Sequence, residues 1–375
     1  MIALLGSLVL GSLFYPVPSP LPAGQPGDVI WSRPLSSGVA LPSAGANWLL
    51  LYHTRSATGA DVAVSGTLAI PRGAPPPGGW PIISWAHGTE GNAPQCAPSH
   101  EAKPTFEQRF LDHLVALGYA IAQTDYEGEG TPGIHPYFVA AASAHDLTDI
   151  VRAARGIDSR IGKRWIVMGH SEGGAAAIAT AAAGTAWAPE LQLLGAVSYA
   201  PGSQIGTLLH AMSQSADPGP NLVLSAMMIE GIASADPAIR LSDILSPQAL
   251  AALPELQARC VDELMRNSSW VSFTPASIFR SGVDLQPLMR DFIANEPGLQ
   301  RIAVPLLLLQ GSADPMVQPD ATSSLQFELC QRPVKLLYRE LPGENHSTVL
   351  AASLDQVEAW LADRFAGKPA PSNCS

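Results

Sequence analysis

The chain has 375 residues, of which 47% are apolar and 14% charged, and its formal net charge is −11. A chain of this length can bury a substantial core, as one large α/β domain with an insertion or as two smaller domains. The acidic balance argues against a nucleic-acid partner, because no basic patch is available to displace the counterions of phosphates.

The first 14 residues form an apolar stretch broken only by Gly and Ser. This stretch is too short to span a bilayer comfortably and is typical of the hydrophobic part of a signal peptide. A charged start and an A-x-A cleavage site are missing, so the segment is either a truncated signal or an uncleaved anchor. We expect residues 1–25 to be a leader and lead-in, and the protein to be secreted, or membrane-anchored if the leader stays.

Alternating and apolar runs, followed by helical patterns, predict a mostly parallel sheet covered by helices on both faces. The predicted strands up to the middle of the chain lie at 48–53, 60–71, 81–86, 118–124, 164–168 and 193–199. The predicted helices between them lie at 107–117, 140–155 and 175–183. The first two strands fit a hairpin that begins the sheet.

About a hundred residues separate the strand at 193–199 from the next clear strand at 304–309, although a crossover needs only a dozen or so. Helical patterns at 206–212, 222–233 and 247–266 fill the gap. We therefore predict an α/β core at 26–202 and 301–375, with a helical cap at 203–300 over the site. The alternative is a structural subdomain with its methionines in its own core. A last strand at 334–340 and a helix at 349–365 end the fold.

A sharp turn is the centre of the predicted site. A short apolar run there ends in Gly169-His170-Ser171-Glu172-Gly173 and passes directly into an Ala-rich helical stretch. G-x-S-x-G between a strand and a helix is typical of a nucleophile turn. The two glycines let the strand and the helix approach each other, and Ser171 stands at the helix N-terminus. We predict that Ser171 is a nucleophile.

A serine hydroxyl needs a nearby base, normally a histidine oriented by a carboxylate. In this architecture the acid and then the histidine follow the serine along the chain, which leaves His210 and His346. His346 follows the last strand in a loop before a helix and is the predicted base, whereas His210 fits an ordinary helical histidine.

The predicted acid is Asp314, which follows a strongly apolar strand at the edge where α/β sheets place their sites. Asp320, just beyond, fits a helix cap. Glu344 is too close to His346 in sequence to reach it easily.

Acyl transfer also needs backbone N–H donors for the developing oxyanion. The amide of Glu172, at the positive end of its helix, is one expected donor. The other is expected from Gly88 or Thr89, after the strand at 81–86, and the residues leave the choice between them open. His87 is expected to brace this loop, and the Glu172 carboxylate is assigned no chemistry.

Metal and cofactor signatures are missing. H-E-x-x-H, a Walker loop and a calcium-binding loop do not occur. One G-x-G-x-x-G match, at 128–133, has Pro132 and Gly133 where a helix would have to begin. Four cysteines lie far apart without a C-x-x-C pair, which favours two disulfides in an exported chain and leaves three connectivities open. They are Cys96, Cys260, Cys330 and Cys374. We expect neither a metal nor a cofactor.

Six short motifs together resemble the secretory lipase family over about 26–365. They are WAHGT at 85–89, DYEGEG at 125–130, HPY at 135–137, GHSEGG at 169–174, GSAD at 311–314 and GENH at 343–346. The resemblance implies an α/β-hydrolase fold with a helical lid, and a secreted, cofactor-free carboxylic ester hydrolase. It also implies Ser171 as nucleophile, Asp314 as acid and His346 as base.

The same resemblance implies that Cys96 bonds to Cys260 and Cys330 to Cys374. Glu172 departs from it, because a small or amide residue is expected at that position. We expect an ester substrate, small or lipid, and a transient contact of the cap with a lipid interface. Two rival functions are a serine peptidase of the same fold and a catalytically silent binding protein.

Overall fold

The computed structural model describes residues 15–36, 38–100, 105–213 and 222–374. The expected leader, Met1 to Phe14, lies outside the described residues. Among the helices of the described part, none is both long and apolar enough to cross a bilayer.

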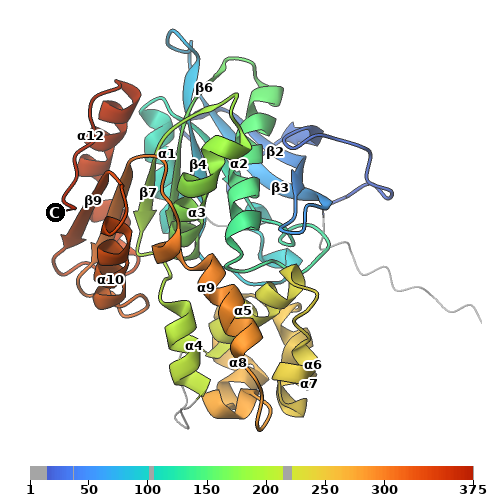
Figure 1. The fold of residues 1–375 in the computed structure, drawn as a ribbon. Coiled ribbons are helices and arrows are strands. Elements are labelled where there is room, and N and C mark those ends of the chain that lie inside the picture. The colour runs from blue at the N-terminus through green and yellow to red at the C-terminus, as the bar shows by residue number, and fades with distance from the viewer. Residues whose placement is uncertain (1–14, 37, 101–104, 214–221, 375) are drawn as a thin grey trace, which may run out of the picture.

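A sheet of nine strands, in the order β1-β2-β3-β5-β4-β6-β7-β8-β9, forms the centre of the fold (Figure 1). β1, β2 and β3 pair antiparallel, β3 also pairs antiparallel with β5, and the pairs from β5 to β9 are parallel. The strands are β1 (Val29–Pro34), β2 (Ala44–Arg55), β3 (Asp61–Pro71), β4 (Trp80–Ala86), β5 (Ala120–Thr124), β6 (Ile161–His170), β7 (Gln192–Tyr199), β8 (Leu306–Gly311) and β9 (Leu336–Leu341). The predicted fold class is confirmed, and so is the hairpin of β2 and β3. The hairpin does not begin the sheet, however, because β1 precedes it and pairs with β2.

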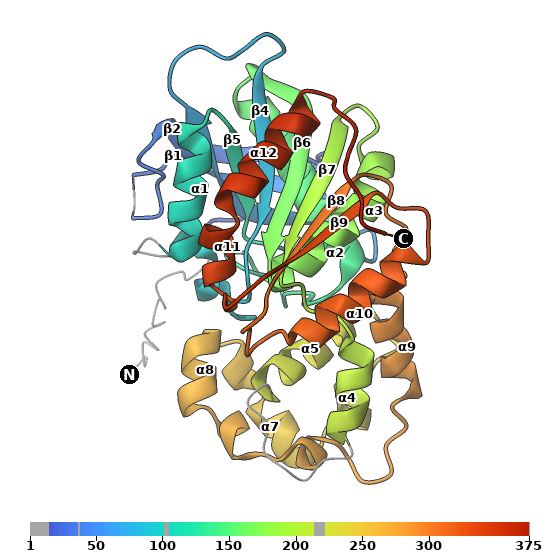
Figure 2. The same cartoon turned by 90° about the vertical axis from the view of Figure 1, so that its left-hand side faces the viewer.

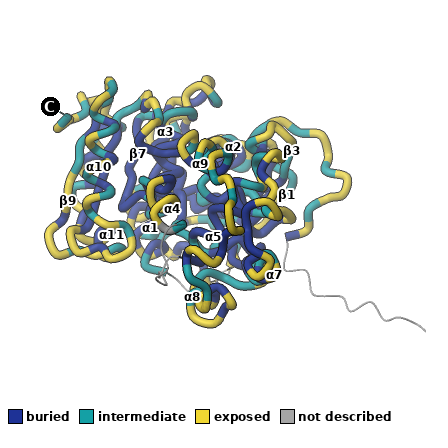
Figure 3. Tube along the Cα trace, turned by 60° about the horizontal axis from the view of Figure 1, so that its bottom comes forward, coloured by how far each residue is buried: buried dark blue, intermediate teal, exposed yellow. Residues whose placement is uncertain are grey.

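Helices cover both faces of the sheet, and each face has its own apolar core. One face is covered by α1 (Phe106–Ala116), α11 (Thr348–Ala352) and α12 (Leu354–Phe365), which Figure 2 shows in front of the strands. The other is covered by α2 (Ala140–Ile157), α3 (Glu172–Trp187) and α10 (Pro319–Cys330). Because both faces are covered, strands such as β7 are buried along most of their length (Figure 3).

The last predicted helix, 349–365, is wrong in one respect, because it is broken into α11 and α12 at Ser353. This serine is fully buried, and its hydroxyl donates to the Leu350 carbonyl at 3.2 Å. A serine that bonds to the backbone in this way competes with regular helix geometry.

Between β7 and β8 the chain forms a helical insertion (residues 203–300) with an apolar core of its own, including Met227, Ile229, Trp270 and Phe292. Figures 1 and 2 show its helices gathered beyond one end of the sheet. They are α4 (Ile205–Ser213), α5 (Leu222–Ala235), α6 (Leu241–Ile244), α7 (Pro247–Leu256), α8 (Val261–Asn267) and α9 (Gln286–Asn295).

Two disulfides fix the insertion and the C-terminal tail. Cys96 bonds to Cys260 and Cys330 to Cys374, with Cα–Cα distances of 5.4 and 5.3 Å, as the resemblance implied. The first bond also explains why the predicted helix at 247–266 is wrong as a single element: Cys260 is extended (φ −86°, ψ 161°) and starts the new helix α8. The chain must leave its helical path there to reach the loop after β4.

Candidate active site

The turn after β6 holds Ser171 in a backbone conformation that few residues adopt. Ser171 has φ 59° and ψ −116° and caps α3. Its amide donates to the Tyr199 carbonyl at the end of β7, and its carbonyl accepts from Gly174, Ala175 and Gly202. These bonds hold a strained turn in place, which is typical of a functional position.

Two glycines make the turn possible, as the sequence predicted. A Cβ on Gly173 would lie 2.0 Å from the Ala86 carbonyl oxygen, and one on Gly169 would lie 2.1 Å from the Gly173 oxygen. Strand and helix therefore approach more closely than any side chain allows.

Asp314 and His346, predicted from chain order and from their places after two strands, meet at the same edge of the sheet. Asp314 follows β8, and His346 lies in the β9 loop (residues 342–347). His346 Nδ1 donates to Asp314 Oδ2 at 2.7 Å. The other carboxylate oxygen accepts from the amides of Met316 and Val317 at 2.8 and 3.0 Å. Burial raises the pKa of Asp314, but its bonds to His346 and to these amides bring it below the usual value.

Ser171 and His346 line one cavity of about 370 Å³. The His346 side chain is 17% exposed, so its ring is open to this space, whereas the Asp314 side chain is fully buried. Within the described residues no hydrogen bond joins the Ser171 hydroxyl to the His346 ring. The structure thus pairs the acid with the base and brings both to the cavity of the serine. In a structure without substrate, such a contact is often long or misaligned.

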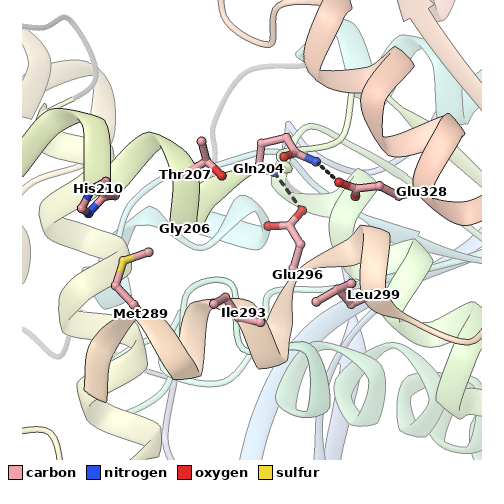
Figure 4. Close-up of a pocket in the computed structure, with 9 residues that line it drawn as sticks. All are labelled: Gln204, Gly206, Thr207, His210, Met289, Ile293, Glu296, Leu299 and Glu328. Atoms are coloured by element: carbon pink, nitrogen blue, oxygen red, sulfur yellow. Dashed lines mark hydrogen bonds between the residues drawn. The ribbon is translucent and has the colours of Figure 1, made fainter. Parts of the chain in front are cut away.

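The alternative base and acid lie elsewhere. His210 lies on α4 and lines a separate cavity of about 380 Å³ that Ser171 does not line (Figure 4). Asp320 is exposed in the first turn of α10, but the expected cap is wrong, because Gln318 is the N-cap and no side chain caps the helix. Neither residue can replace the Asp314–His346 pair beside Ser171.

A polar joint, which is the set of hydrogen bonds that Gln204 makes with Glu296 and Glu328, links the insertion to the core (Figure 4). The backbone N–H of Gln204 donates to Glu296 Oε1 at 2.8 Å, which links the start of the insertion to its end. The Gln204 side chain donates to Glu328 of α10 at 2.9 Å. Gln204 also lines a larger cavity of about 540 Å³ that reaches Ser171. The joint therefore fixes part of the wall of this cavity.

The β4 loop (residues 87–91) lies beside Ser171, and Gly88 and Thr89 both line the smaller cavity. The Gly88 amide is already engaged, because it donates to Glu107 Oε1 at 3.3 Å. The Thr89 hydroxyl is 2.6 Å from the Tyr137 hydroxyl. His87 braces the loop as expected, since its Nδ1 donates to the Gly88 carbonyl at 2.6 Å.

The Glu172 carboxylate is buried and paired, which the sequence did not reveal. Its Oε1 accepts from His135 Nε2 at 2.7 Å, and His135 Nδ1 donates to the Glu127 carbonyl at 3.0 Å. Glu129 Oε1 lies 3.7 Å from the same His135 nitrogen. Burial, together with the nearby Glu172 charge, raises the pKa of Glu129 well above its usual value.

Sequence reasoning also missed the pair formed by Glu107 and His170. Glu107, on α1, lies 3.2 Å from His170 Nδ1. Its sequence signal was only that of an acidic residue in a first helical turn, and no local pattern shows which histidine it meets. Within the described ranges, no group of three or more Cys, His, Asp or Glu side chains could hold a metal ion.

Comparison with known proteins identifies the family. The secretory lipase family pattern matches residues 99–373. Lipase 6 of Candida albicans is 23% identical over 96% of this chain and 82% of its own length. A Mycobacterium tuberculosis protein named a probable inactive lipase is 24% identical over 95% of this chain and 82% of its own.

Solved structures share the fold. Candida antarctica lipase A in its closed state superposes with a TM-score of 0.76 at 17% identity, covering 92% of this chain and 84% of that one. The rice cell wall degrading esterase LipA of Xanthomonas oryzae gives 0.73 at 19% identity, covering 92% of this chain and 100% of that one. The chain therefore belongs to the secretory lipase family and is a carboxylic ester hydrolase with the α/β-hydrolase fold.

Proposed function

We propose that the protein hydrolyses acyl esters through an acyl-enzyme on Ser171, with His346 as base and Asp314 as the acid that orients it. The observation that carries this proposal is the 2.7 Å bond between His346 Nδ1 and Asp314 Oδ2 at the rim of the Ser171 cavity. A carboxylate on Nδ1 keeps Nε2 free to accept the serine proton and stabilises the imidazolium that forms.

The reaction then has two stages. Ser171 Oγ attacks the ester carbonyl while His346 takes its proton, and the amides of Glu172 and Thr89 donate to the oxyanion. Thr89 is preferred over Gly88 because the Gly88 amide is already bonded to Glu107. His346 next gives the proton to the departing alcohol, and water, activated by the same base, releases the acid.

Two cavities share Ser171, and the base distinguishes them. His346 must return its proton to the alcohol oxygen, so the alcohol occupies the cavity that His346 lines, the smaller one. The larger cavity also contains Ser171 and Thr89, whereas His346 is not among the described residues that line it. We assign the acyl chain to this larger cavity.

The side chains around each cavity agree with this assignment. Leu208, Ala211, Leu224 and Met228 of the helical insertion line the larger cavity, which is mainly apolar. Burial of an alkyl chain there contributes about 0.8 kcal/mol per methylene. The smaller cavity has more charged and hydroxyl groups, among them Thr105, Glu107, Asp262 and Ser347. We expect it to accept a polar, uncharged alcohol better than an anionic one.

The insertion is proposed to act as a cap that meets lipid surfaces transiently. Leu208 and Met316 line the larger cavity and are 44% and 43% exposed. Exposed large apolar side chains at a cavity mouth favour contact with an apolar surface. Secretion is proposed on the family match and on the two disulfides, which persist in oxidising compartments.

Two measurements test the proposed function. Purified protein should hydrolyse p-nitrophenyl butyrate, and a fluorophosphonate probe should label Ser171. Ser171→Ala should lose both activities while keeping its thermal unfolding curve. Hydrolysis of aminoacyl p-nitroanilides alone would favour a peptidase. A folded wild type that is neither active nor labelled would favour a silent scaffold, the state that the name of the Mycobacterium tuberculosis relative suggests for that protein.

A further inference from the structure

One buried carboxylate, Glu107, receives hydrogen bonds from three sides. Its Oε1 accepts from the Gly88 amide at 3.3 Å and lies 3.2 Å from His170 Nδ1. Its Oε2 accepts from Trp85 Nε1 at 3.3 Å. Burial raises the pKa of Glu107, but the hydrogen bond and charge of His170 outweigh burial and bring it below the usual value. Three donors on one carboxylate favour its ionised form.

The His170 ring connects this carboxylate to the β9 loop. His170 Nε2 lies 2.7 Å from the His346 carbonyl oxygen, and the two rings are 4.5 Å apart at their centroids. Both nitrogens of His170 therefore face acceptors. Whichever nitrogen carries the proton, the ring bridges Glu107 and the His346 carbonyl, and an imidazolium donates to both.

The hydrogen bonds of Glu107 and His170 connect parts of the site whose relative positions matter for the proposed reaction. Gly88 adjoins Thr89, the proposed oxyanion donor, and His346 is the proposed base. His170 itself precedes Ser171 at the end of β6. Through one carboxylate and one ring, the β4 loop, the nucleophile turn and the β9 loop are bonded into a single network.

We propose that Glu107 and His170 are a positioning pair that holds the β4 and β9 loops in register with Ser171. The proposal rests on the function proposed above. Neither side chain needs to touch the reacting atoms. The pair acts through the backbone of its neighbours, and a displacement of about 1 Å at such a loop lowers turnover up to about 100-fold.

The pair also affects the charge felt by the base. The titratable groups around His170 are Glu107 from α1 and His346 from the β9 loop, and His87, Glu90 and Asp262 lie farther round the same region. His346 also has Asp314 at 2.7 Å on its other side. A protonated His170 ring opposes a second positive charge on His346, so replacing His170 with a neutral side chain should move the acid limb of kcat/KM to higher pH.

The experiment compares His170→Leu, His170→Gln, Glu107→Leu and Glu107→Gln on p-nitrophenyl butyrate from pH 4 to 9. The two leucine variants should lose about 10- to 100-fold in kcat, because orientation is lost. Both side chains also line the smaller cavity, so KM is measured beside kcat, and the rescue and the pH profile separate positioning from binding. Glu107→Gln should recover most of the kcat lost in Glu107→Leu, because the side-chain oxygen of Gln can still accept from the Gly88 N–H and the His170 ring, as Glu107 Oε1 does. His170→Gln should show the shift of the acid limb.

A second His–Glu pair on α1 provides a matched control. His113 Nε2 lies 2.6 Å from Glu358 Oε1 of α12, outside both cavities that Ser171 lines. His113→Gln and Glu358→Gln should keep the wild-type kcat, KM and pH profile. Thermal unfolding of every variant separates a loss of fold from a loss of position.

The possible results are distinct. The expected kcat loss, rescue and pH shift support the positioning pair. An active wild type whose His170 variants keep its kcat and acid limb would overturn the pair and leave the proposed function intact. A loss of kcat that is equal at all pH values, without rescue by Glu107→Gln, would overturn the positioning role and show that the two side chains only pack. A wild type that is inactive and unlabelled would overturn both proposals.

Discussion

Two histidine–carboxylate pairs near Ser171 have the same bond length and different surroundings. His346 and Asp314 are joined at 2.7 Å, and so are His135 and Glu172. The His346 side chain is 17% exposed and lines a cavity with Ser171, whereas the His135 side chain is 2% exposed. The hydrogen bond alone therefore does not define a catalytic pair. A proton can pass to a substrate only from a ring that faces the space where the substrate binds.

Removing the nucleophile should have the largest effect. Ser171→Ala should lower kcat on p-nitrophenyl butyrate by about 10⁴-fold or more, because the acyl-enzyme cannot form. The free energy of unfolding should change by less than about 1 kcal/mol, since alanine and serine meet the same strain at this φ. Residual turnover close to wild type would show that another group carries the reaction.

A change in the pair of Asp314 and His346 should have the next-largest effect on kcat. Asp314→Asn should lower kcat about 10³- to 10⁴-fold, because the amide no longer fixes the tautomer of His346 or stabilises its cation. The matched control is Asp320→Asn, an exposed position in α10, which should keep full activity. Equal activity of the two variants would remove Asp314 from the mechanism.

Filling one cavity at a time should shift specificity about tenfold. Met228 lines the larger cavity and Met265 the smaller one. Met228→Trp should lower the ratio of kcat/KM on p-nitrophenyl decanoate to that on p-nitrophenyl acetate about tenfold, because the larger side chain shortens the proposed acyl site. Met265→Trp should leave that ratio unchanged and lower activity on bulky alcohols. The reverse pattern would exchange the two assignments.

A change in the buried pair of Glu172 and His135 should affect stability more than activity. Glu172→Gln keeps a hydrogen-bond partner for His135 but removes its counter-charge. We expect a loss of about 1 to 3 kcal/mol in unfolding free energy at pH 7 and a kcat within about tenfold of wild type. Chemical denaturation and steady-state kinetics measure the two effects. A loss in kcat as large as that of Asp314→Asn would make the two pairs functionally equal.

The smallest effect is expected from Glu127, beside the buried pair. Burial raises the pKa of Glu127 to about 7, against a smaller opposing effect of His135. A carboxyl with a raised pKa in the folded state stabilises the protein while protonated, and this contribution is lost as pH rises from about 4.5 through 7. Glu127→Gln should therefore be about 1 to 2 kcal/mol more stable than wild type at pH 8 and equal to it at pH 4. Denaturation at both values, with unchanged turnover, checks the sign.

Local patterns in the sequence predicted every strand of the described sheet except β1, most of the helices, and the nucleophile, base and acid proposed above. Strands that are buried on both faces must be apolar, and the G-x-S-x-G turn needs glycines where backbones approach within about 2 Å of a missing Cβ. Two predicted helices were wrong as single elements. One is interrupted before Cys260, which is bonded to the distant Cys96, and the other at Ser353, whose buried hydroxyl bonds to the Leu350 carbonyl three residues away.

The sequence by itself determined which residues stand at the carboxyl ends of the parallel strands, because the strands and their ends follow from short-range periodicity. Asp314 and His346 were predicted as a pair, whereas only the tertiary structure decided which other acidic side chains meet histidines beside Ser171. Glu107 lies 63 residues from His170, and Glu172 lies 37 from His135. Such pairings depend on how α1 and the loop before α2 pack against the nucleophile turn, and no local pattern of residues encodes that packing.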